Sequence, residues 1–177
     1  MAHVIIKRRV EPDSWKRLDA GASGDALDRS GDLVVPLALW SASRTLVARR
    51  AGRTGVWLAA GQEADALAPD LHALPLVAVE FPKLADGRGH STGWLLRKRL
   101  GYRGELRAFG DLIQDSLLLL ERCGFDAFEL RHGEDPARAL AAFSELPSSY
   151  QASATEPLPA FRRHAGASVL NVAMETA

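Results

Sequence analysis

The sequence predicts an α/β fold whose sheet is mainly parallel. Short apolar runs typical of buried strands alternate with amphipathic segments of helical length, and glycine or proline separates them. Repeated strand–helix units of this kind build parallel sheets, because the helix carries the chain back before the next strand begins. Four such units fit either a doubly wound sheet or part of a barrel, and the sequence does not separate these two architectures.

The first part of the chain is expected to contribute only marginal elements to this sheet. Residues 1–32 are polar and glycine-bearing, with one short apolar run that fits an edge strand. The apolar run Leu33–Trp40 contains Pro36, which has no backbone N–H for a strand ladder, so we expect an edge strand or a broken element there. A short helix over Ser41–Arg50 and a strand over Val56–Ala60 follow.

The middle of the chain is more regular. Leu76–Phe81 is almost continuously apolar, as expected for a strand that is buried on both faces. A helix from about Ser91 to Leu100 and a short strand over Glu105–Phe109 come next. Asp111 is placed to cap the following helix, and Gly124 is placed to end it.

The last part is predicted to add one strand, one helix and a final short strand. Asp126–Leu130 alternates between polar and apolar residues, and Asp135–Pro136 has the cap and the proline that open a helix. Tyr150–Ala152 is expected to form the last strand. The sequence therefore predicts a single α/β domain over residues 1–152 and a loosely packed C-terminal tail over residues 153–177.

Composition argues against several classes of protein. Lys and Arg number 22, as do Asp and Glu, and this zero net charge argues against bulk attraction to nucleic acid or acidic membranes. No apolar run approaches the roughly 18 residues of a membrane span, and the N-terminus lacks the order of a secretory signal. We therefore expect a cytoplasmic protein that contacts neither nucleic acid nor membrane.

The sequence also lacks the residues that common metal and redox sites need. Cys123 is the only cysteine, which excludes an intrachain disulfide, a dithiol pair and a Cys-ligated iron–sulfur cluster. His90 and His132 are isolated from other ligands at metal spacing, and no dinucleotide-binding glycine motif follows a strand. We therefore expect neither a metal nor a redox cofactor.

The most informative segment is Phe81–Ser91, in which an acid, an arginine and a serine are separated by glycines. Glycines let backbone N–H groups turn toward a ligand, and a helix N-terminus favours anions. Because parallel strands end at one edge, Phe81–Ser91, Phe109–Asp115 and Arg131–Asp135 are expected on a single rim. Guanidinium groups match the oxygens of carboxylate, sulfate or phosphate, so this rim is a candidate site for a small anion. The candidate ligand-binding residues are Asp86, Arg88, Ser91, Arg97, Arg107, Asp111 and Asp115.

A purely structural interpretation of the same residues stays open. Asp86 could accept hydrogen bonds from backbone N–H groups of a turn, and Ser91 could cap the helix that follows. Arg97 and Arg107 could face solvent or form ion pairs with the acids that follow the next strand. Ligand binding and these structural roles are compatible with each other.

Four motifs within residues 55–151 resemble one bacterial family. They are Phe-Pro-Lys-x-x-Asp-Gly-Arg-Gly-x-Ser, Leu-Arg-x-x-Leu-Gly-Tyr, Gly-Glu-Leu-Arg-Ala-x-Gly-Asp and Arg-Cys-Gly-Phe-Asp-x-Phe. The family is classed as a domain of unknown function, and its genes are commonly found beside those of assimilatory sulfite reductase. Family descriptions name it an oxidoreductase of sulfite reduction, so the resemblance implies that pathway. The chain departs from the family pattern at His90 and at Gly93–Trp94, which removes an anion contact from position 94.

Two functions from different classes are compatible with these residues. The one we favour is an accessory or binding protein of assimilatory sulfate and sulfite reduction, which contacts sulfite reductase or its electron donor, or binds a small anion. The alternative is an enzyme of sulfite reduction that acts at the rim of acids and arginines without a recognisable cofactor. Carboxylates with shifted pKa values in a concave pocket would favour the enzyme, whereas a rim of paired charges would favour the binding protein.

Overall fold

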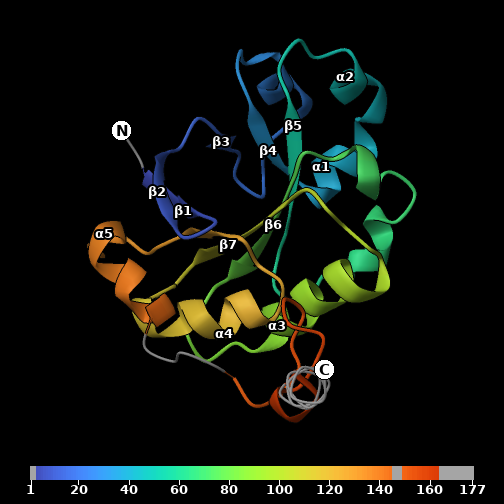
Figure 1. Ribbon diagram of the computed structural model, residues 1–177. Coiled ribbons are helices and arrows are strands. Elements are labelled where there is room, and N and C mark those ends of the chain that lie inside the picture. Colours follow the sequence, from blue (N-terminus) through green and yellow to red (C-terminus); the bar gives the residue numbers. More distant parts are fainter. Residues whose placement is uncertain (1–2, 145–148, 164–177) are drawn as a thin grey trace, which may run out of the picture.

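The sheet of this protein is curled and mostly parallel. In the computed structural model, which describes residues 3–144 and 149–163, eight strands form one sheet in the order β2-β1-β8-β7-β6-β5-β4-β3 (Figure 1). Strands β3 to β8 run parallel to their neighbours, whereas β1 is antiparallel to both β8 and β2. The strands are β1 (His3–Ile6), β2 (Arg9–Pro12), β3 (Lys16–Arg17), β4 (Leu33–Pro36), β5 (Thr54–Leu58), β6 (Leu76–Phe81), β7 (Glu105–Gly110) and β8 (Ala127–Glu129).

The strand order distinguishes between the two architectures that the sequence left open. Strands β3 to β8 lie side by side in chain order, without the reversal that defines a doubly wound sheet. A sheet built this way curls in one direction, so the protein is a half-barrel. The predicted strand–helix repeat is incomplete, because β5 and β6 are joined by the 3-10 turns Ala64–Leu67 and Leu71–Ala73.

The helices are short and lie on one side of the sheet. In Figure 1, α1 and α2 lie to the right of the strands, and α3, α4 and α5 lie below them. Helix α3 continues into a π turn, Leu95–Arg99, and α4 is entered through a 3-10 turn, Gln114–Ser116. The helices are α1 (Leu37–Ala42), α2 (Arg44–Ala48), α3 (Arg88–Trp94), α4 (Leu117–Arg122) and α5 (Pro136–Ala139). No helix in the described ranges is long and apolar enough to cross a membrane.

A short connection between the two edges of the sheet accounts for the curl. Strands β2 and β3 are the opposite edges, yet only residues 13–15 separate them in the chain. In a flat sheet, eight strands at about 4.8 Å spacing would place these edges roughly 34 Å apart. The backbone from Pro12 to Lys16 reaches at most about 15 Å. The sheet must therefore curl until residues 13–15 can cross its open side.

Alternation along the strands divides the apolar residues between two faces. Val77 and Val79 of β6 belong to the large core beneath the helices, whereas Leu76 and Ala78 belong to a smaller cluster on the inner face. On that inner face the rings of Trp57 and Phe109 meet edge to face, with centroids 5.7 Å apart. The main core thus lies between sheet and helices, and the inner face is a second, smaller contact layer.

Ion pairs fasten the connecting residues to the inner face. Arg107 of β7 is 2% exposed, and its Nη1 donates to Asp13 Oδ2 at 2.8 Å. Arg17 of β3 donates to Glu129 Oε2 of β8 at 2.6 Å, and its guanidinium lies 3.9 Å from the centroid of the Phe109 ring. These contacts join the first strands of the chain to the last ones across the interior of the half-barrel.

Several local predictions are confirmed. Strand β6 spans the predicted residues Leu76–Phe81. Gly124 adopts φ +106° one residue after the Cys123 cap of α4, a conformation that ends a helix at low cost only for glycine. Asp135 caps α5, because its Oδ1 accepts a hydrogen bond from the Ala137 N–H at 2.9 Å.

The prediction of a single edge strand in residues 1–32 is wrong. Residues 3–32 contain three strands, and β1 lies between β2 and β8, away from the edge. Strand β4 is internal, because it pairs with both β3 and β5, so the run Leu33–Trp40 is not an edge strand. It is the broken element that was the other expectation, because it changes from strand to helix at Pro36. Its Pro36 is tolerated as the last residue of the strand, where φ −64° leads directly into α1.

Two predictions about helix starts are also wrong. Asp111 does not cap α4. Its backbone N–H instead donates to the carbonyl of Phe81, the last residue of β6, at 2.8 Å. Ser91 does not cap α3, because that helix already begins at Arg88 and Ser91 lies inside it.

The C-terminal segment contains no strand within residues 149–163, so the predicted strand Tyr150–Ala152 is wrong. This segment contacts the domain through the Ala154 N–H, which donates to the Arg122 carbonyl at 2.8 Å. Arg163 then pairs with Glu156 at 2.5 Å within the segment itself. The remainder of the predicted tail, residues 164–177, lies outside the described residues.

Removing one partner of the buried Asp13–Arg107 pair should destabilise the fold more than removing one partner of an exposed pair. Asp13→Ala leaves a buried guanidinium with Glu105 as its only acid, and we expect a loss of about 3 kcal/mol in the free energy of unfolding. Asp70→Ala removes the partner of Arg44 at an exposed pair and should cost less than about 1 kcal/mol. Urea denaturation of both variants measures the difference, and equal losses would contradict the role of the buried pair.

Candidate functional site

The carboxyl ends of β6, β7 and β8 form one rim of the half-barrel. Phe81, the last residue of β6, is in register with Gly110, the last residue of β7. Asp111 then connects three loops: its Oδ2 accepts from the Leu84 N–H at 3.1 Å, and its Oδ1 accepts from Arg131 at 3.3 Å. The Asp111 carboxylate therefore links the loops of the rim to one another through hydrogen bonds.

Asp86 and Arg88 form a closed pair in the loop after β6. Asp86 Oδ1 accepts from the backbone N–H and the Nε of Arg88, at 3.1 and 3.0 Å, and Oδ2 accepts from Nη2 at 2.6 Å. The Arg88 side chain is nevertheless 62% exposed. These donors lower the pKa of Asp86 to about 2, since they favour the charged carboxylate. Asp86 is therefore ionised throughout the physiological pH range and cannot exchange a proton near neutrality.

Glycines place this pair close to neighbouring elements. A side chain at Gly89 would meet the ring of Phe81 at 2.5 Å, so only glycine lets the first turn of α3 lie against the end of β6. At Gly61, in the turn after β5, φ is +88°, and a Cβ atom there would lie 2.9 Å from Arg88 Nη1. The guanidinium of Arg88 therefore lies over the Gly61 turn as well as beside Asp86.

The structure does not bring all the predicted site residues together. Asp86, Arg88 and Asp111 lie on the rim, Ser91 is exposed within α3, and Asp115 is exposed in the 3-10 turn before α4. The two remaining arginines of the predicted set, Arg97 and Arg107, lie elsewhere.

Arg97 is a structural residue at the amino ends of β7 and β8, away from the rim. Its guanidinium donates to the carbonyls of Gly124, Tyr102 and Gly104 at 2.7 to 2.9 Å, and it forms an ion pair with Asp126 at 2.8 Å. These partners precede β7 and β8 in the chain, so they lie at the amino ends of those strands. The interpretation of Arg97 as an ion-paired residue thus fits its position, with a different acid from the ones expected.

Arg107 points into the half-barrel instead of toward the rim. Together with Arg17 it belongs to a cavity of about 230 Å³ on the inner face of the sheet. Burial raises the pKa of the neighbouring Glu105, and the charge of Arg107 opposes this shift. The cavity is lined by Asp13, Trp15, Arg17, Val34, Ala78, Arg107 and Glu129.

Sequence reasoning missed most of this cavity, although a signal was present. Glu105 and Arg107 alternate with the apolar residues of β7, and Glu129 follows Phe128 in β8. Charged residues at every second position of a short apolar strand indicate that one face of the sheet is polar. Asp13 and Arg17 gave no comparable signal, because their partners are far away in the sequence.

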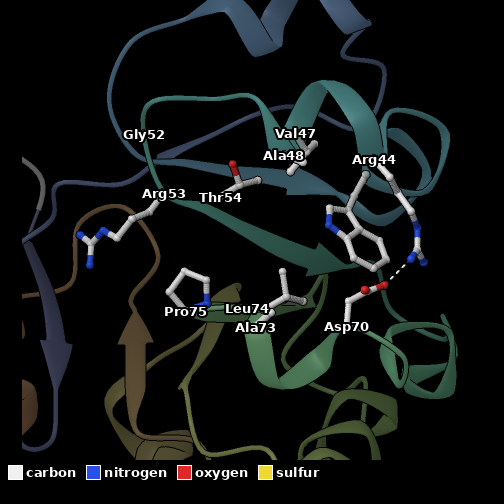
Figure 2. A pocket seen from close by; sticks show the side chains of 11 residues that line it. Arg44, Val47, Ala48, Gly52, Arg53, Thr54, Asp70, Ala73, Leu74 and Pro75 are labelled. Carbon is white, nitrogen blue, oxygen red and sulfur yellow. Dashed lines mark hydrogen bonds and ion pairs between the residues drawn. The ribbon is translucent and has the colours of Figure 1, made fainter.

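A second cavity lies at the amino ends of β5 and β6, beneath α1 and α2. Its volume is about 530 Å³, and Figure 2 shows Val47, Thr54 and Leu74 facing its centre. Arg44 forms an ion pair with Asp70 across one side, and its guanidinium lies 4.1 Å from the centroid of the Trp40 ring (Figure 2). This cavity is mainly apolar and contains none of the predicted site residues.

The described residues contain no cluster of three or more His, Cys, Asp or Glu side chains that could hold a metal ion. Cys123 is half-buried, and burial raises the pKa of its thiol, so the reactive thiolate is disfavoured. The polar chemistry available at the described sites is therefore that of arginine–carboxylate pairs.

These features define a curled, mostly parallel α/β half-barrel with an exposed charged rim and a polar interior. The chain belongs to a family described as bacterial protein of unknown function (DUF934), whose model matches residues 55–161. No curated protein matches the chain. The matched region contains β5 to β8 and the whole rim, whereas β1 to β4 and residues 13–15 precede it.

The low pKa of Asp86 should depend on the side chain of Arg88. In Arg88→Ala the backbone N–H still donates to Asp86, but two side-chain donors are lost, so the pKa should rise from about 2 toward the ordinary value near 3.9. Carboxyl ¹³C chemical shifts recorded against pH measure this change. Asp32, whose pKa is lowered by Arg53, serves as the internal control and should not shift. An unchanged Asp86 would contradict the pairing.

Proposed function

We propose that this chain is a binding protein of assimilatory sulfite reduction that works without a redox cofactor of its own. Its rim would contact sulfite reductase or the electron donor of that enzyme. The proposed pathway rests on the motifs that the chain shares with its family, and the mode of action rests on the rim. The family model that matches the chain is described as one of unknown function, so the pathway comes from the resemblance of the motifs alone.

The observation that carries this proposal is that the rim charges are exposed and paired with each other. Arg88 pairs with Asp86, and Arg131 pairs with both Asp111 and Glu134. The guanidinium groups of Arg88 and Arg131 remain about half exposed, so both can form further hydrogen bonds with a partner. Asp86 is held ionised, which suits an electrostatic contact and does not suit acid–base catalysis.

The charge balance of the rim favours a protein partner over a free anion. The three rim segments, residues 81–91, 109–115 and 131–135, carry three basic residues against five acidic ones, so a free anion gains nothing from the net charge. A protein surface with complementary acids and bases can match both signs at once. Leu84, which is 49% exposed in the same loop, adds an apolar contact of the kind that such interfaces use. The eight charged rim residues are Lys83, Arg88, Arg131, Asp86, Asp111, Asp115, Glu134 and Asp135.

An enzyme of sulfite reduction is the second candidate, and one observation favours it. Glu105 is a carboxylate whose pKa is raised by burial, and it lies beside Arg107 on the inner face. A carboxyl group with a raised pKa in a polar interior can act as a general acid or base. This alternative moves the chemistry from the rim to the interior, so substitutions on the rim distinguish the two functions.

The pathway is tested by growth of a strain that lacks the gene. We expect no growth on sulfate or sulfite as sole sulfur source, and normal growth on sulfide or cysteine. Complementation with the unaltered gene should restore growth on sulfite, whereas a gene carrying Arg88→Glu and Arg131→Glu should not. Normal growth of the deletion strain on sulfite would refute the pathway.

The mode of action is tested by binding of the purified chain to sulfite reductase and to its electron donor. The double charge reversal on the rim should weaken binding at least about tenfold, and added salt should weaken binding of the unaltered chain. Glu105→Gln should leave this binding unchanged, because Glu105 lies in the interior. Binding that tolerates the rim substitutions but fails in Glu105→Gln would favour the enzyme.

A further inference from the structure

A third cavity, of about 670 Å³, lies at the amino ends of β4 and β5, whereas the rim lies at the carboxyl ends of β6 to β8. Leu33, the first residue of β4, is in register with Thr54, the first residue of β5. The two segments that precede these strands therefore lie side by side. They line the cavity together with Leu46 of α2.

The two segments are held against each other by one arginine and two glycines. Arg50 Nη1 donates to the carbonyls of Leu27 and Arg29, the latter at 2.9 Å, and Nη2 donates to the Gly31 carbonyl at 2.7 Å. Any side chain at Gly52 would collide with the same Gly31 carbonyl, so only glycine lets the segments approach this closely. The cavity walls are therefore fixed by contacts within the protein.

Two other arginines of this cavity have no partner. Arg29 and Arg49 are exposed, and no described residue forms a hydrogen bond or an ion pair with either guanidinium group. Asp28 is the one acid among the lining residues, so with Arg50 included the cavity wall carries an excess of two positive charges. In the three cavities beside α1 and α2, inside the half-barrel and beside the C-terminal segment, by contrast, every lining arginine pairs with an acid. Those arginines are Arg8, Arg17, Arg44, Arg53, Arg97 and Arg107.

We propose that this cavity binds a small organic phosphate monoester. The phosphoryl oxygens accept hydrogen bonds from Arg29 and Arg49, and the organic part contacts Ala51 and Leu46, which is 49% exposed. A phosphate monoester carries about −1.5 to −2 charges at neutral pH, which matches the excess of two positive charges, whereas a sulfate ester carries a single charge. The volume falls within the roughly 300–1,000 Å³ of pockets for small organic ligands, so the cavity has room for more than a phosphate ion.

Matched small molecules test the charge and the organic part separately. Phenyl phosphate and phenyl sulfate share a ring and differ in charge, whereas glycerol 3-phosphate and ribose 5-phosphate vary the organic part. At about 5 mM and equal ionic strength, we expect at least one of the three monoesters to raise the melting temperature of the full chain more than phenyl sulfate or inorganic phosphate does. Calorimetry then gives the dissociation constant.

Two results with these compounds would overturn the proposal. Stabilisation by phenyl sulfate or inorganic phosphate equal to that by the best monoester would show that neither the second charge nor the organic part matters. The absence of binding by all three monoesters would exclude the ligand class.

A double variant locates the binding in the cavity. Arg29→Gln with Arg49→Gln should weaken monoester binding at least about tenfold, and the variant should stay folded because both side chains are exposed and unpaired. Arg138→Gln is the matched control. It removes an exposed arginine of α5, on the other side of the molecule from α2, whose side chain likewise pairs with no described residue (Figure 1). Unchanged affinity in the double variant, or an equal loss in the control, would refute the assignment of the site.

Binding in the cavity and binding at the rim can fail independently. Arg88→Glu with Arg131→Glu leaves the cavity intact, so monoester binding should persist in that variant. Arg29→Gln with Arg49→Gln should in turn leave binding to the protein partner of the rim unchanged. If the rim variant loses the monoester as well, the ligand lies on the rim and the cavity assignment is wrong.

Discussion

Residues 13–15 form the connection on which the rest of the structure depends. They join the two edges of an eight-stranded sheet, and a link this short forces the sheet to curl. The curl turns one face inward, where Asp13 meets Arg107 and Arg17 meets Glu129. An inner face with such pairs is polar in the middle of an otherwise apolar fold, so each charge needs a partner within the interior. The same constraint thus shapes the sheet and selects the residues inside it.

The curl also separates the charged rim from the polar interior of the half-barrel. Loops after β6, β7 and β8 emerge at one rim, where Asp111 ties them together and Asp86 holds Arg88 in place. The interior lies behind these loops and uses different arginines. Exposed pairs at the rim are held loosely by free energies of about 1 kcal/mol or less, so a partner can exchange them. Buried pairs in the interior meet little competition from water and are rigid.

Local chemistry explains which features could be predicted from the sequence. Strand β6, the end of α4 at Gly124 and the cap of α5 at Asp135 depend on neighbouring residues only, and all three were predicted. Asp86 and Arg88 lie two residues apart, and their turn was likewise visible as a motif. Features that depend on distant partners were not predictable. Asp111 accepts a hydrogen bond from the loop after β6 and does not cap the helix that follows it, and the strand that Pro36 ends is internal.

The sequence by itself determined the α/β class, the mostly parallel order of the middle strands and the acid–arginine turn that follows β6. Tertiary structure alone decided that the sheet is a half-barrel, that Arg97 binds carbonyl groups at the amino ends of β7 and β8, and that Arg107 points inward. Periodicity and capping act over a few residues and leave a trace in the sequence. The partner of Arg107 is Asp13, 94 residues away, and only the curl of the sheet brings the two together.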